Sequence, residues 1–275
     1  MALFLSRGLV YRLACGVVFL LVFSLALYGQ DDPPQHPASG ASSSSESSSL
    51  SADWRDVSPF LLPGNFLRDQ EEMWSFPYQL TRGQHWSHTV TIAAATLALL
   101  STDPYVDPYF NHTAAFRGFN RAFGSNVTAA ETIAIPSALY VAGLDLRDTY
   151  MQKTALLAAE AVADSEVLRA VMNSVTNRWR PQDISSRRNY ADTFFHDVSH
   201  VGSSFPSGHT IAAVSVATVI ARRYRNHRWV PWVAYGLAGT IGFSRISLRT
   251  HFPSDVFLGG ILGYAIARYD VLQSH

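Results

Sequence analysis

The sequence predicts an all-α protein, a compact bundle of about six helices with an irregular N-terminal arm. Three observations support this fold class. Apolar residues recur at helical spacing between Asp148 and Asn177, with charged residues on the other side. Small residues fill 206–223, and glycines punctuate 254–270, which permits close approach between helices. No segment shows a strand pattern that competes with these helices.

The first 29 residues have the layout of an export signal. Arg7 and Arg12 precede an apolar stretch from Leu13 to Leu27, which is shorter than the ~20 residues that span a bilayer comfortably. We therefore expect a signal peptide over 1–29 and export of the protein, with a retained signal anchor as the alternative.

Two further segments precede the bundle. Residues 30–53 are rich in Ser, Pro, Gly and Asp and predict a disordered linker. Residues 54–85 alternate large apolar side chains with prolines, which predicts an irregular arm with at most a short helix near Phe66 to Trp74. The helical domain is expected over 86–275, with helices at 86–101, 127–144, 149–177, 206–223, 229–248 and 254–270.

Composition excludes several classes of partner and chemistry. With 48% hydrophobic and 15% charged residues and no net charge, the chain lacks the basic surface of a nucleic-acid-binding protein. Cys15 is its single cysteine, so one chain forms neither a disulfide nor a thiolate metal site. His196 and His200 lie in a polar loop without a matching carboxylate pattern, so no metal site is predicted.

The location of the folded domain is open between two alternatives. The third helix is charged, and the uncharged runs elsewhere are shorter than the ~20 residues of a membrane span, which favours a soluble or peripherally attached periplasmic enzyme. Four arginines between the fourth and fifth helices would suit a cytoplasmic loop of a multi-span protein, or a solvated turn. They are Arg222, Arg223, Arg225 and Arg228.

Two clusters of polar residues fall at helix ends. Pro206-Ser207-Gly208-His209 combines a helix start with a hydroxyl, a glycine and an imidazole, which suits an oxyanion because helix N–H groups point at it. Between Ser244 and Asp255, Arg245 precedes His251, and an aspartate near a histidine can orient its ring. Each cluster alone would equally fit an ordinary helix start with capping residues.

Taken together, these residues resemble the signature of the type 2 phosphatidic acid phosphatase superfamily, which includes class A nonspecific acid phosphatases and vanadium haloperoxidases. The family pattern is lysine, six residues and Arg-Pro; then Pro-Ser-Gly-His; then Ser-Arg, five residues, His, three residues and Asp. Arg180-Pro181 and the two later parts match at every fixed position. The similar region covers about 86–270.

The resemblance implies a phosphatase that acts on phosphate monoesters, including lipid phosphates or isoprenyl diphosphates. His251 would be the nucleophile that forms a phosphohistidine, Asp255 would orient it, and His209 would protonate the leaving oxygen. The phosphoryl oxygens would be bound without metal by Arg180, Ser207, Gly208 and Arg245. Two alternatives remain: a vanadate-dependent haloperoxidase, and a non-catalytic relative with the same pocket. Vanadate would inhibit the phosphatase but serve the haloperoxidase as cofactor.

The first part of the pattern departs from the family. Asn173 stands where the family has lysine, so one cationic contact with phosphate is missing. Asn173 can donate a hydrogen bond, and Arg178 is expected either to lean toward the phosphate or to be a solvated arginine at the end of its helix.

Overall fold

The computed structural model describes residues 57–272, apart from 84–85, 185–189, 191 and 197–201. The expected signal peptide and linker lie outside the described residues, as does His200. Within these ranges the protein is helical throughout and has no strand, so the predicted all-α fold is confirmed.

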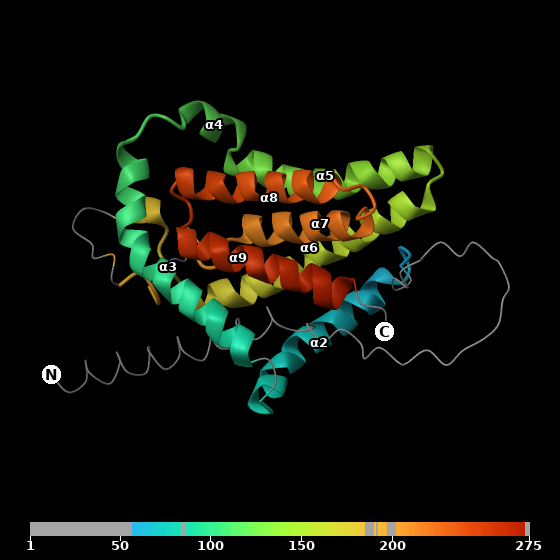
Figure 1. Ribbon diagram of the computed structural model, residues 1–275, viewed down its shortest axis with the longest axis horizontal. Coiled ribbons are helices and arrows are strands. Elements are labelled where there is room, and N and C mark those ends of the chain that lie inside the picture. The colour runs from blue at the N-terminus through green and yellow to red at the C-terminus, as the bar shows by residue number, and fades with distance from the viewer. Residues whose placement is uncertain (1–56, 84–85, 185–189, 191, 197–201, 273–275) are drawn as a thin grey trace.

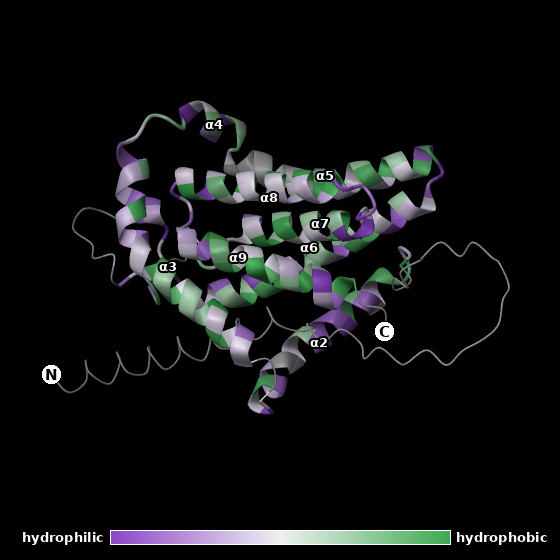
Figure 2. Cartoon of the chain, in the orientation of Figure 1, coloured by the Kyte–Doolittle hydropathy of each residue, from purple (hydrophilic) through white to green (hydrophobic). Residues whose placement is uncertain are grey.

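Five helices form the bundle: α5 (Ser125–Asp145), α6 (Thr149–Thr176), α7 (Gly208–Arg223), α8 (Val230–Ser247) and α9 (Pro253–Ala265). The central helix is α7, which packs against the other four (Figure 1). Helix α9 continues as a π-helical segment, η2 (Ile266–Val271). Hydrophobic residues are spread along α7, α8 and α9 (Figure 2), and the core joins Leu157 and Leu168 of α6 to Ile211 of α7 and Leu258 of α9.

Two further helices lie outside this bundle. Helix α3 (Trp86–His112) crosses the end of the bundle where α8 is connected to α9, and it contacts both (Figure 1). Helix α2 (Leu62–Thr81) packs on α6 and η2. A short helix, α4 (Arg117–Ala122), connects α3 to α5.

The expectations for three helix boundaries were wrong. The arm contains the 20-residue helix α2 rather than a short one. Pro63 lies in the first turn, where the missing proline N–H costs no helical hydrogen bond, and Pro77 lies inside the helix. Helix α3 likewise continues past the expected end at 101 and contains Pro104 and Pro108. Helix α7 begins at Gly208, two residues later than expected, because Ser207 is the extended N-cap residue.

The close packing predicted from small residues is present between α7 and α9. A Cβ on Gly263 of α9 would lie 2.2 Å from the backbone oxygen of Ile211. The hydroxyl of Ser215 donates to the Gly263 carbonyl oxygen at 3.1 Å, which joins the two backbones directly. None of the described helices has both the length and the apolar character that a membrane crossing requires.

Candidate active site

A polar pocket of about 250 Å³ lies where α6 ends and α7 begins. It brings together five of the residues singled out in the sequence, namely Asn173, Arg180, Gly208, His209 and His251. Thr132, Glu166, Arg169, Ser203, Pro206 and Ala212 complete its wall. Histidines, arginines and a helix N-terminus therefore face one small space, an arrangement suited to an anion.

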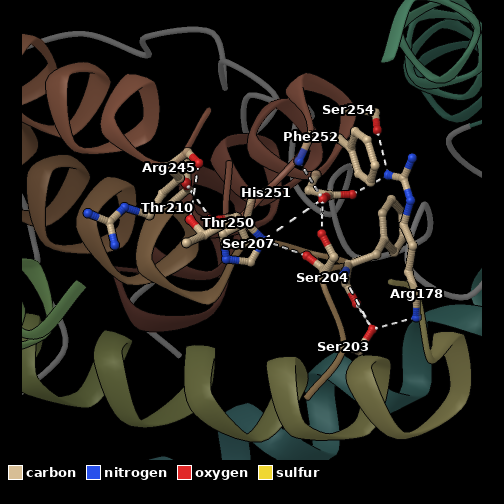
Figure 3. Close-up of polar contacts among 12 residues, drawn as sticks. Arg178, Ser203, Ser204, Ser207, Thr210, Arg245, Thr250, His251, Phe252 and Ser254 are labelled. Carbon is tan, nitrogen blue, oxygen red and sulfur yellow. Dashed lines mark hydrogen bonds and ion pairs between the residues drawn. The ribbon is translucent and has the colours of Figure 1, made fainter. Parts of the chain in front are cut away.

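His251 lies in the connection between α8 and α9, two residues after Arg249, whose φ of 57° turns the chain. Its Nδ1 is 2.6 Å from the carbonyl oxygen of Ser204 (Figure 3). A carbonyl oxygen only accepts hydrogen bonds, so Nδ1 carries the proton and donates it. In the neutral ring, the lone pair is then on Nε2, the nitrogen available for nucleophilic attack.

The electrostatic surroundings of His251 favour this neutral ring. Burial lowers the pKa of His251 well below 6.5, and the positive charge of Arg180 lowers it further. The hydrogen bond to Ser204 acts in the opposite direction but is the weaker influence. The lowered pKa favours the neutral ring, in which Nε2 carries the lone pair.

Asp255 is held at the start of α9 by a set of donors. Its Oδ2 accepts from the Phe252 backbone N–H at 2.8 Å and from the Ser204 hydroxyl, while Oδ1 accepts from Arg178. Its Oδ2 lies 3.8 Å from Nδ1 of His251. The direct hydrogen bond to the His251 ring comes from the Ser204 carbonyl, while the Asp255 carboxylate lies beside the same ring nitrogen and also holds the Ser204 hydroxyl.

Arg178 has neither of the positions expected for it. It is neither solvated nor part of the pocket wall, because its guanidinium is buried between two carboxylates. It donates to Asp255, to Asp103 of α3 at 2.7 Å and to the Ser254 hydroxyl at 2.8 Å. The ring of Phe252 lies 4.0 Å from its central carbon. Arg178 therefore contacts the Asp255 carboxylate and does not lie in the pocket wall.

Arg245 and Ser207, which were expected to bind phosphoryl oxygens, have hydrogen-bond partners within the bundle. The Arg245 guanidinium donates to the carbonyl oxygen of Phe123 and, at 2.9 Å, to the Ser244 hydroxyl, and its side chain extends away from the His251 ring (Figure 3). Ser207 is fully buried, and its hydroxyl accepts from Thr210 at 2.9 Å. Neither residue lines the pocket, because each side chain is held by neighbours within the bundle.

Arg180 and Asn173 do lie in the pocket wall. The Nε of Arg180 is buried and has no hydrogen-bond partner among the described residues, and burial lowers the pKa of this arginine. An unpartnered donor facing a polar pocket is suited to an anionic ligand. The Asn173 amide, in contrast, has partners on both sides. In the orientation that satisfies its oxygen and its nitrogen, it donates to the Phe205 carbonyl oxygen at 2.8 Å and accepts from Arg169 Nη1 at 3.2 Å.

His209 is the second residue of α7 and lines the same pocket as His251. His196, in contrast, stacks on Trp179 with ring centroids 3.5 Å apart. Among the described residues of 57–272, no group of three or more His, Cys, Asp or Glu side chains has an arrangement that could hold a metal ion.

Sequence reasoning missed three residues at this site. Asp103 lies on α3, 151 positions before its contact Ser254, and no local pattern marks it. Ser204 acts through its backbone carbonyl, which any residue could supply. Arg169 lies four residues before Asn173, and this spacing on one helix face is the signal that could have found it.

The fold and the pocket define an all-α protein with a buried histidine beside an arginine-lined polar pocket. Residues 154–274 match the model of the PAP2 superfamily, in agreement with the resemblance of the sequence motifs. It is 29% identical over 123 residues to the bacitracin transport permease protein BcrC of Bacillus licheniformis, a match that covers 45% of this chain. The chain spans only 57% of the length of that relative.

One solved structure is also similar: the crystal structure of a transmembrane PAP2-type phosphatidylglycerolphosphate phosphatase from Bacillus subtilis. The two chains are 19% identical with a TM-score of 0.38, and the match covers 76% of this chain and 92% of the other.

Proposed function

We propose that this protein is a phosphatase that hydrolyses phosphate monoesters through a phosphohistidine on His251. The observation that carries the proposal is the hydrogen bond from His251 Nδ1 to the Ser204 carbonyl, which leaves the Nε2 lone pair on a residue of the pocket wall. Arg180 and the N-terminus of α7 surround the space in which a phosphoryl group would lie.

In the first step, Nε2 of His251 forms a bond to phosphorus while the bond from phosphorus to the ester oxygen breaks. His209 gives a proton to that oxygen, so the product leaves as an alcohol. The negative charge of Asp255, 3.8 Å from Nδ1, stabilises the positive ring of the phosphohistidine. In the second step, water gives a proton to His209 and attacks phosphorus, which releases phosphate and restores Nε2.

An apolar cavity of about 450 Å³ supports a substrate with an apolar group. It lies between α5, α7 and α8, and Thr132 lines both this cavity and the polar pocket. Ala212 of α7 lines the polar pocket, and the next residue, Ala213, lines the apolar cavity. We therefore propose phosphate esters of long-chain alcohols, such as lipid or isoprenyl phosphates, as the substrate class.

The test compares the wild type with His251→Ala on p-nitrophenyl phosphate. We expect the variant to lose at least about 10³-fold in kcat, since the nucleophile is removed. Rapid denaturation of the wild type during turnover of a radiolabelled ester should trap an acid-labile, alkali-stable phosphohistidine. Equal rates for the two proteins would refute the mechanism, and halide oxidation that requires vanadate and peroxide would favour a haloperoxidase.

A further inference from the structure

The phosphate pocket contains a second arginine, Arg169 of α6, for which the mechanism above has no role. It lies one helical turn before Asn173, on the same face of the helix. Both residues line the pocket that also contains Arg180 and His251. The charge of Arg169 is close enough to Arg180 to lower the pKa of that residue.

The path of the Arg169 side chain into the pocket depends on Gly208. A Cβ on Gly208 would lie 2.0 Å from Cδ of Arg169 and 3.1 Å from its Nε. The arginine therefore lies directly across the first residue of α7, beside the helix N-terminus that favours an anion. Glycine is the residue that leaves room for this crossing.

Two neighbours fix the Arg169 guanidinium. Glu166 Oε2 accepts from Nε at 2.7 Å and forms an ion pair with Nη2 at 2.7 Å. When the Asn173 amide is oriented with its nitrogen toward the Phe205 carbonyl, its oxygen accepts from Nη1 at 3.2 Å. The two hydrogen bonds employ the N–H of Nε and one N–H of Nη1, so further N–H groups remain on Nη1 and Nη2. A guanidinium held in this way keeps charged donors on the pocket wall for contact with phosphoryl oxygens.

We propose that Arg169 is a phosphate-binding residue, held in position by Glu166 and Asn173. The inference rests on the proposed function for its substrate. Asn173 itself brings no charge to the position of the expected lysine. Its amide instead anchors Arg169, one helical turn earlier, and Arg169 supplies the positive charge. The Arg169 side chain is longer than that of asparagine, and it reaches from that turn into the pocket wall.

The experiment measures the binding of inorganic phosphate by calorimetry and the hydrolysis of p-nitrophenyl phosphate. It compares the wild type, Arg169→Ala and Arg169→Lys, with Arg225→Ala as control, because Arg225 is an exposed arginine outside the pocket. We expect Arg169→Ala to raise the Kd for phosphate and lower kcat/KM by about 10- to 100-fold, the range for a lost charge-assisted hydrogen bond. Arg169→Lys should lie between, and Arg225→Ala should match the wild type.

The two readouts separate this inference from the proposed function. If Arg169→Ala binds phosphate and hydrolyses the ester within twofold of the wild type, the role of Arg169 is refuted and the phosphatase stands. If the wild type binds phosphate without hydrolysis and Arg169→Ala weakens binding, the role of Arg169 stands and the proposed reaction fails. A wild type that neither binds nor hydrolyses overturns both. Should Arg169→Ala not fold, Arg169→Gln enters the same comparison with the same expectation.

Discussion

Arg178 and Asp103 form a buried ion pair at 2.7 Å, with only 2% of each side chain exposed. The same guanidinium also pairs with Asp255, so one arginine joins α3 to the first turn of α9 beside the candidate nucleophile. Asp103 additionally accepts from the Ser254 backbone N–H at 3.2 Å. The position of α9 relative to α3 is thus set by charges that have no access to water.

The first prediction concerns the stability of this network. Arg178→Ala leaves two buried carboxylates without their shared counter-charge, which should lower the free energy of unfolding by about 3–5 kcal/mol. Urea denaturation followed by circular dichroism measures the change. The exposed Arg225→Ala should lie within about 0.5 kcal/mol of the wild type. A loss below about 1 kcal/mol for Arg178→Ala would contradict the role of the pair.

The second prediction concerns the acid side of the pH profile. Burial raises the pKa of the Asp255 carboxyl to about 6, and the negative charge of Asp103 raises it as well. Asp255 therefore takes up a proton as the pH falls through about 6. Because the charged carboxylate stabilises the phosphohistidine, kcat/KM should decline below about pH 6.

Asp103→Asn tests the sign of this effect. The substitution removes the negative charge beside Asp255, and Arg178 then has Asp255 as its one remaining carboxylate partner in this network. Both changes lower the pKa of Asp255. The acid limb of kcat/KM should therefore move to lower pH by roughly half to one unit. An unchanged limb, or one that moves to higher pH, would show that Asp255 does not govern it.

The third prediction concerns the apolar cavity. Ala234 of α8 lines it, and Ala234→Phe should fill much of its volume. We expect kcat/KM for a long-chain alkyl phosphate to fall about tenfold or more, since each buried methylene contributes roughly 0.8 kcal/mol, while p-nitrophenyl phosphate is hydrolysed as before. Gly239→Phe is the control, because Gly239 is an exposed residue of the same helix with open space around it. Equal losses of kcat/KM on both substrates would exclude the cavity as the binding site for the alkyl chain of the substrate.

Much of the bundle could be predicted from the sequence because its signals are local. The apolar spacing of α6 and the small residues of α7 and α9 each lie within one element, and they gave the helices and their close packing. The prolines of α2 and α3 misled the prediction of length. Proline disfavours a helix locally, but contacts with the bundle can outweigh that preference.

The candidate site could be predicted only in part for a related reason. His209, Arg180 and His251 occupy motifs whose spacing places them at helix ends, and the structure brings them to one pocket. The spacing did not reveal that Arg178 and Arg245 bond elsewhere, because their partners Asp103 and Phe123 come from distant segments. Long-range pairing decides which arginine faces the pocket, and a motif does not encode it.

The fourth prediction concerns the packing of α9 on α7. Gly263→Ala would place a Cβ 2.2 Å from the backbone oxygen of Ile211, a group that cannot rotate away. The helices must separate, and the free energy of unfolding should fall by about 1–3 kcal/mol or more. Gly239→Ala is the matched control: nothing lies within 4 Å of its Cβ, so alanine should stabilise α8 by about 0.5–1 kcal/mol. Equal effects at both positions would contradict the close contact.

The last prediction couples Gly208 to Arg169. Gly208→Ala puts a Cβ 2.0 Å from Cδ of Arg169, so the arginine must leave its path across the start of α7. The Kd for phosphate should then rise about as much as in Arg169→Ala. In the double variant the clash no longer exists, so adding Gly208→Ala to Arg169→Ala should change the Kd by less than about twofold. Calorimetry on the four proteins measures this coupling. Independent, additive losses would mean that Gly208 acts on phosphate through its own backbone rather than by giving room to Arg169.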